Sequence, residues 1–230
     1  MFASVVLLAG ALPGGTSSDM TLQRLAGYVG YQNSTSSSVT MVSISHPFDS
    51  DAYASTQAQS IAVLDFPDDS RVTLGGNSVI QVHANFSKRK HVRRHQDPIV
   101  WEGSAIRLPS DASILRFDIH QPYDGNELYV VSTRFARIAI RGTTALLADS
   151  LSGDILTCLD CGAGDIVADV GGNDFAILNN ETLRIRANGR VTVEETNPVI
   201  LQEFIDAGLS TYIPRPRPSP KPRFHWPIKL

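Results

Sequence analysis

The sequence predicts a mostly β fold, a β-solenoid-like or rolled β-sandwich of short strands with one α-helix near its carboxyl end. From Ile61 onward, short apolar or alternating runs recur between turn residues, which is typical of an all-β domain. The alternation also predicts one buried face, because Leu115, Phe117 and Ile119 alternate with charged residues. A composition of 42% hydrophobic and 19% charged residues lies in the globular range. We therefore expect one folded domain built on a β core.

The expected strands follow one another closely along this domain. They span residues 61–65, 71–74, 78–84, 105–108, 114–119, 127–131, 135–141, 155–159, 165–170, 183–187 and 191–194. Between them lie groups in which Gly or Asn can take the positive φ that tight turns require. These groups are Pro67-Asp68-Asp69, Gly75-Gly76-Asn77, Asp124-Gly125-Asn126, Gly171-Gly172-Asn173 and Asn188-Gly189.

A helix is expected after the last strand, over residues 198–207. Asn197 is suited to cap it, Pro198 fits its first turn, and Gly208 fits just beyond its end. One apolar face with spacing i, i+3 and i+4 should dock the helix on the sheets. That face consists of Leu201, Phe204 and Ile205.

The remaining segments divide the chain into four parts. Residues 1–20 are interpreted as a signal peptide or its remnant, because Met1 to Ala11 is apolar and ends in small residues; the alternative is an ordinary buried strand. Residues 21–60 form a Gly-, Ser- and Thr-rich lead-in that we expect to be loosely structured. Residues 61–210 form the β domain with its closing helix. Residues 211–230 alternate Pro with bases, which predicts an extended tail.

Basic residues are concentrated in two places, although the net charge is -3. They are Lys88, Arg89, Lys90, Arg93 and Arg94 in one run and Arg215, Arg217, Lys221, Arg223 and Lys229 in the tail. The rest of the chain is therefore acidic, so we expect no nucleic acid to bind the body of the domain. The 88–94 run could bind an anionic glycan, a nucleic acid or a lipid head group, or it could be a solvated loop.

The sequence contains no hydrolase nucleophile elbow, phosphate-binding loop, dinucleotide glycine pattern or zinc-protease motif. We accordingly expect a protein that is not an enzyme and has no cofactor or metal. The pair Cys158 and Cys161 allows three readings: part of a zinc site, a redox pair, or a small disulfide across a turn with two reduced thiols as its variant. The chain has no other cysteine, and Gly162 to Gly164 leads into a further strand rather than a helix, so a local disulfide is favoured for an exported protein.

Two segments resemble a FecR-type domain, over residues 61–193 in all. Near the start, Pro67-Asp68-Asp69-Ser70 joins two strands rich in Val and Leu, as a proline-aspartate-glycine-serine turn does in that family. The central match is Arg141-Gly142-Thr143-Thr144, which is similar to the arginine-glycine-threonine of the family's central strand. A Gly after a strand permits a bend and Thr suits strands, so an architectural role is favoured over direct ligand contact by Arg141.

The resemblance implies a periplasmic part of an envelope signalling protein that relays ligand status from an outer-membrane siderophore transporter to a sigma factor. The family's cytoplasmic sigma-binding domain and transmembrane helix are not found in this sequence. We therefore expect a periplasmic or secreted domain of the bacterial envelope that binds an envelope protein, with no transmembrane span. The alternative is a secreted carbohydrate- or surface-binding β module that uses the 88–94 loop with Trp101 and Tyr123.

Overall fold

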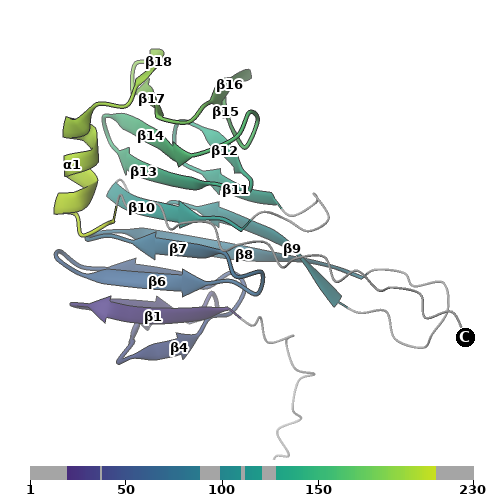
Figure 1. The fold of residues 1–230 in the computed structure, drawn as a ribbon. Coiled ribbons are helices and arrows are strands. Elements are labelled where there is room, and N and C mark those ends of the chain that lie inside the picture. Colours follow the sequence, from purple (N-terminus) through teal and green to yellow (C-terminus); the bar gives the residue numbers. More distant parts are fainter. Residues whose placement is uncertain (1–19, 37, 89–98, 110–111, 121–127, 211–230) are drawn as a thin grey trace, which may run out of the picture.

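The described part of the chain consists of two nine-stranded β-sheets that lie face to face, with one helix against one of them (Figure 1). The structure is a computed structural model and describes residues 20–36, 38–88, 99–109, 112–120 and 128–210, without the side chains of 85–88, 99–103 and 128. The prediction of a mostly β fold with one carboxyl-terminal helix is confirmed. No helix in these ranges is long and apolar enough to cross a membrane.

The sheet that carries the helix is called sheet 1. From its carboxyl-terminal edge its strands are β18 (Val191–Glu195), β17 (Glu181–Arg186), β14 (Gly153–Asp160), β13 (Thr144–Ser150), β10 (Ala112–Asp118), β7 (Arg71–Leu74), β6 (Ile61–Asp65), β1 (Thr21–Ala26) and β4 (Ser45–Pro47). Every neighbouring pair in this sheet is antiparallel.

The opposite sheet is called sheet 2. From the same end its strands are β16 (Asn173–Ile177), β15 (Ile166–Val170), β12 (Arg137–Ile140), β11 (Leu128–Ser132), β9 (Ile99–Arg107), β8 (Val79–Lys88), β5 (Tyr53–Thr56), β2 (Val29–Gln32) and β3 (Thr40–Met41). Only the pair β9 and β11 is parallel. From β6 onward the chain alternates between the sheets. The hairpins β6–β7, β13–β14 and β17–β18 and the single strand β10 belong to sheet 1, and the hairpins β8–β9, β11–β12 and β15–β16 belong to sheet 2.

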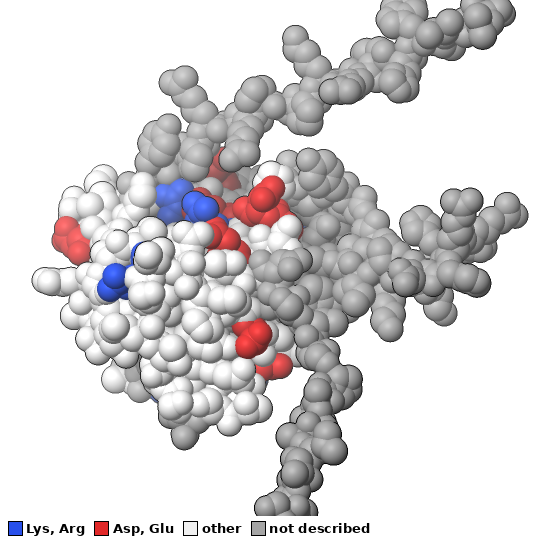
Figure 2. All heavy atoms as spheres, turned by 90° about the horizontal axis from the view of Figure 1, so that it is seen from below, with Lys and Arg blue, Asp and Glu red and all other residues white. Residues whose placement is uncertain are grey.

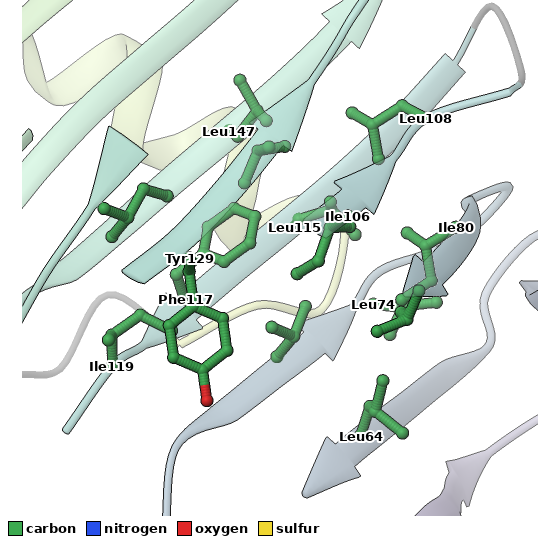
Figure 3. Packing of buried hydrophobic residues seen from close by; sticks show 14 of the residues in the cluster. Leu64, Leu74, Ile80, Ile106, Leu108, Leu115, Phe117, Ile119, Tyr129 and Leu147 are labelled. Atoms are coloured by element: carbon green, nitrogen blue, oxygen red, sulfur yellow. The ribbon is translucent and has the colours of Figure 1, made fainter. Parts of the chain in front are cut away.

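The hydrophobic core lies between the two sheets (Figure 3). Leu64 and Leu74 enter it from sheet 1 and Ile80 and Ile106 from sheet 2, all of them at most 1% exposed. The predicted alternation in β10 is confirmed on its buried side. Its inward residues, with Ile119 just beyond the strand, are Leu115, Phe117 and Ile119.

The helix α1 (Pro198–Asp206) covers the outer face of sheet 1, as predicted, and Asn197 caps it by accepting the Val199 N–H at 2.9 Å. The predicted docking face is partly wrong, since Ile200 and Phe204 are buried whereas Ile205 is 45% exposed. The residues that share this second cluster are Leu146, Leu159, Ile200, Phe204 and Leu209. Gly208, at φ +84°, turns the chain so that Leu209 returns beside Phe204, and this selects the Ile200 side of the helix.

The Gly-, Ser- and Thr-rich segment 21–60, expected to be a loose lead-in, contributes five short strands, β1 to β5, to the same two sheets. Leu22 and Val29 from this segment, and Met20 just before it, are buried in the common core. The signal peptide interpretation for residues 1–20 and the extended tail predicted for 211–230 lie outside the described residues, except for Met20.

Candidate functional site

The predicted Arg-Gly-Thr-Thr motif forms the connection by which the chain crosses from sheet 2 to sheet 1. Arg141 follows β12 with an exposed side chain, and its backbone N–H bonds the Asp165 carbonyl at 2.8 Å. Gly142 has φ +46°, the left-handed conformation that a Gly adopts at little cost. Thr143 and Thr144 are buried, at 4% and 9% exposure, so the motif turns its two hydroxyls into the protein.

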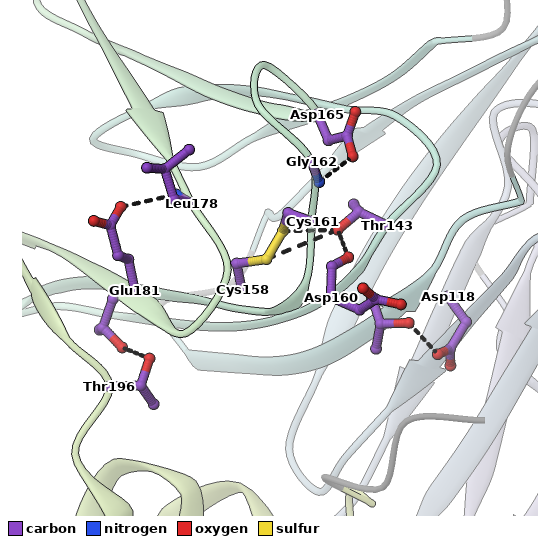
Figure 4. The surroundings of a disulfide bond; sticks show 12 residues. Asp118, Thr143, Cys158, Asp160, Cys161, Gly162, Asp165, Leu178, Glu181 and Thr196 are labelled. Atoms are coloured by element: carbon purple, nitrogen blue, oxygen red, sulfur yellow. Dashed lines mark hydrogen bonds between the residues drawn. A yellow bond between two sulfur atoms is a disulfide. The ribbon is translucent and has the colours of Figure 1, made fainter. Parts of the chain in front are cut away.

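The first hydroxyl contacts the turn that contains both cysteines (Figure 4). Thr143 Oγ1 lies 2.6 Å from the Asp160 carbonyl oxygen and 2.8 Å from Cys161 Sγ. Cys158 and Cys161 are joined in a disulfide with a Cα–Cα distance of 6.2 Å, and Cys158 is fully buried. This turn carries the chain back from β14 in sheet 1 to β15 in sheet 2. The disulfide therefore lies in one sheet crossing and contacts the other.

The second hydroxyl belongs to a polar network on the outer side of sheet 1. Thr144 Oγ1 donates to Asp118 at 3.2 Å, and Arg116 donates two bonds to the same carboxylate at 2.8 and 2.7 Å. Arg116 also donates to the carbonyl of Ser210, just after the helix. The Arg116 side chain is only 6% exposed, although its position on the outer face of β10 predicts solvent. These contacts support the architectural role that we hypothesised for the motif.

The basic run 88–94 and the aromatic residues Trp101 and Tyr123, which we predicted as ligand contacts, have no described side chains. Arg89 to Arg94 lie outside the described residues, as does Tyr123. Lys88 ends β8 and Trp101 lies in β9, but the side chains of both are among those not described. Among the described residues, no three His, Cys, Asp or Glu side chains gather in an arrangement that could hold a metal ion.

The edge strands at the two ends of the sheets differ in length. At the amino-terminal end the edge strands β3 and β4 have two and three residues, and β4 ends in Pro47. Short strands and prolines of this kind block the addition of another strand. In the view of Figure 2, most of the visible surface at that end is uncharged. At the carboxyl-terminal end the edge strands β16 and β18 each have five residues.

The β16 edge directs backbone groups away from its own sheet. Gly171 and Gly172, at φ +61° and +86°, form the two-residue turn between β15 and β16, and Val170 pairs with Asn173 across it. Hydrogen-bonded and non-bonded pairs alternate from such a turn, so the non-bonded residues of β16 are Asp174 and Ala176. Their N–H and C=O groups point outward, and both residues are exposed.

The charge of this edge is negative. Asp169 and Asp174 face each other across the β15–β16 hairpin, and the hairpin contains no Lys or Arg. The other edge strand, β18, already uses Glu194 in an ion pair with Arg184 at 2.7 Å. The arrangement at β16 suits an added strand that carries basic side chains.

Comparison with known proteins relates these features to one family and one solved fold. Residues 52–160 match the family model described as FecR protein. No curated protein matches the chain. Two crystal structures of a proposed anti-sigma factor from Parabacteroides distasonis are similar at 12% identity, with TM-scores of 0.50 and 0.49. Each similarity covers 66% of this chain and 63% or 64% of that one, so the chain spans under two thirds of the protein it resembles in fold.

Proposed function

We propose that the chain, whose residues 52–160 match the FecR family model, is a non-enzymatic sensor or scaffold of the bacterial envelope. It acts by binding another protein, in the periplasm or after secretion, as part of transmembrane signalling. The family match supports a role in signal regulation, and the fold resembles that of a protein described as a proposed anti-sigma factor. The Cys158–Cys161 disulfide supports an oxidising compartment, since cytosolic thiols stay reduced.

The contact is made by strand addition at β16. The observation that carries this proposal is the five-residue open edge of sheet 2, with Asp174 and Ala176 offering outward N–H and C=O groups. A bound strand extends sheet 2 by one position, and its backbone bonds supply affinity without demanding a particular sequence. Asp169 and Asp174 favour a partner segment that contains Lys or Arg.

The fold suits this mode of contact. From β6 onward the chain passes back and forth between two sheets, which supports describing it as a rolled, solenoid-like sandwich. Such an arrangement grows by adding strands at an end. Because the edge strands β3 and β4 are too short to pair with another strand, the added strand is expected at the carboxyl-terminal end.

A pull-down from envelope extracts with three forms of the chain tests this proposal. Ala176→Pro removes one outward N–H while leaving the bonds between β15 and β16 in place. Ala176→Val keeps the N–H and is the matched control. We expect the native chain and Ala176→Val to retain the same transporter, secretin-like or sigma-regulating protein, and Ala176→Pro to lose it.

Two outcomes would contradict the proposal. If no such protein is retained by the native chain, the envelope role fails. If Ala176→Pro retains it as well as Ala176→Val does, binding does not use the β16 edge. Binding to a glycan array that is lost when the 88–94 bases are replaced would instead favour a carbohydrate-binding module.

A further inference from the structure

Two buried carboxyl groups face each other near the tip of the β13–β14 hairpin. Asp149 and Asp154 are direct cross-strand partners, and they are only 5% and 1% exposed. Both side chains point between the sheets, on the same side of the hairpin as Leu147 and Leu156. Neither residue belongs to the disulfide turn or to the β16 edge.

Asp154 connects this hairpin to the opposite sheet. Thr133, at the turn between β11 and β12, donates its hydroxyl to Asp154 Oδ2 at 2.5 Å. The same hydroxyl oxygen accepts the backbone N–H groups of Phe135 and Ala136 at 3.0 and 2.9 Å. No donor among the described residues reaches the other carboxylate oxygen, Asp154 Oδ1. A buried acceptor without a donor is costly, so this oxygen requires an explanation.

Among the described residues, the side chains that line the pocket beside Asp149 include two positively charged ones, Arg107 and Arg134. A pocket of about 320 Å³ adjoins Asp149. Its lining consists of Arg107, Leu108, Pro109, Ser132, Thr133, Arg134, Asp149 and Ser150. Within the sheet, the uncharged Ser113 of β10 lies opposite Asp149 and Ile185 of β17 opposite Asp154. The neighbouring Arg186 of β17 is exposed.

We propose that Asp149 and Asp154 share one proton and thereby form a pH-sensitive latch that holds the β11–β12 turn of sheet 2 against the β13–β14 hairpin of sheet 1. Two ionised carboxylates side by side in a buried site repel each other strongly. One proton removes that repulsion. It also turns Asp154 Oδ1 into a hydroxyl donor toward Asp149, which accounts for the oxygen that no donor in the described part of the chain reaches.

The proton belongs mainly to Asp154. Arg107 and Arg134 line the pocket on the side of Asp149, so positive charge favours the ionised form of that residue. Burial is the largest effect on Asp154 and raises its pKa above the ordinary value of 3.8, whereas its hydrogen bonds with Asp149 and Thr133 lower the pKa by less. The geometry and the direction of this pKa therefore agree.

The latch weakens as the pH rises. Because the folded protein holds the Asp154 proton more tightly than the unfolded chain does, its stabilising effect is complete below pH 3.8 and is lost as the pH rises through the raised pKa. Loss of the proton restores the repulsion between Asp149 and Asp154 across the hairpin. The Thr133 bond itself favours the ionised form of Asp154, so the latch weakens because the repulsion pushes the two carboxylates apart and moves Asp154 from its place beside Thr133. The β11–β12 turn and the adjoining pocket are the first parts of the structure to loosen when Asp154 loses its proton.

Carbon-13 NMR of the native chain tests the shared proton directly. We expect the side-chain carboxyl carbon of Asp154 to titrate with a pKa above 3.8 and the amides of Phe135 and Ala136 to lose protection from hydrogen exchange over the same pH range. A carboxyl carbon that titrates at or below 3.8 would overturn the proposal. So would unchanged protection of both amides across that titration.

The variant Asp154→Asn tests the same latch through stability. Its amide donates to Asp149 at every pH and so imitates the protonated carboxyl. We expect the unfolding constant of the native chain, relative to this variant, to rise about tenfold per pH unit between 3.8 and the raised pKa. The exposed control Asp174→Asn should show no such trend. A pH-independent ratio for Asp154→Asn would contradict the latch, and if that variant does not fold, the carbon titration decides alone.

Discussion

Single residues hold the crossings between the two sheets together. Thr143 contacts the disulfide turn and Thr144 reaches Asp118, so two adjacent side chains serve different parts of the fold. The sequence predicted the motif as architecture but not these partners, because both partners are distant in sequence. Arg116 shows the same limit. Its alternation with Leu115 correctly predicts the outer face of β10, but not that the segment after the helix covers it.

Gly153 is the residue for which the structure makes the sharpest stability prediction. It has φ +136°, and an added Cβ would lie 1.8 Å from the Ile185 carbonyl oxygen of the neighbouring strand. We expect Gly153→Ala to lower the free energy of unfolding by roughly 3 kcal/mol or more, since backbone strain and a steric clash act together.

Gly164 provides the matched control for this change. It also has positive φ, at +84°, but nothing lies within 4 Å of the Cβ position. Gly164→Ala should therefore cost only the conformational penalty, about 1–2 kcal/mol. Urea denaturation of both variants measures the difference, and equal losses would contradict the packing at Gly153.

At the scale of elements, the sequence predicts most strands well, and the exceptions have physical reasons. The bounds of 61–65 and 71–74 agree with β6 and β7, where turn residues border alternating runs. The strand β16 was missed because Asn173 was assigned to the preceding turn and Asp174 interrupts the apolar pattern. An edge strand has one neighbour and much exposed surface, so its sequence carries a weak signal.

The segment after the helix α1 determines which of its two apolar faces is buried against sheet 1. Leu201, Phe204 and Ile205 have helical spacing, yet the docked face is Ile200 with Phe204. Leu209, brought back by the turn at Gly208, fills the space beside Phe204. The sequence alone offers both faces, and only the position of Leu209 distinguishes them.

Substitutions on the two sides of the helix test this packing. Phe204→Ala removes a buried ring from the cluster with Leu146 and Leu159, and we expect a loss of about 3–5 kcal/mol in the free energy of unfolding. Ile205→Ala should change it by less than about 1 kcal/mol, because Ile205 is 45% exposed. Thermal unfolding followed by circular dichroism compares them. A larger loss for Ile205→Ala would mean that the helix docks by the other face.

The molecule has one continuous hydrophobic core, and its edge strands are longer at the carboxyl-terminal end than at the amino-terminal end. One core fills the space between the sheets, from Met20 in the amino-terminal part to Ile185 in β17. This continuity could not be predicted for residues 21–60, where Ser and Thr obscure the strand pattern. The disulfide crossing and the proton-sharing carboxyls lie within the β13–β14 part of the two-sheet fold, whereas the edge strands β16 and β18 lie at its carboxyl-terminal end.

The central claim, that the domain works by adding a partner strand to β16, is tested most directly by residue-resolved amide hydrogen exchange of the chain alone and in complex with its captured partner. We expect the Asp174 and Ala176 amides to exchange rapidly in the free chain and to become protected in the complex. Amide exchange in the short edge strands β3 and β4 should be the same in both. Protection that appears elsewhere while Asp174 and Ala176 continue to exchange rapidly would contradict it.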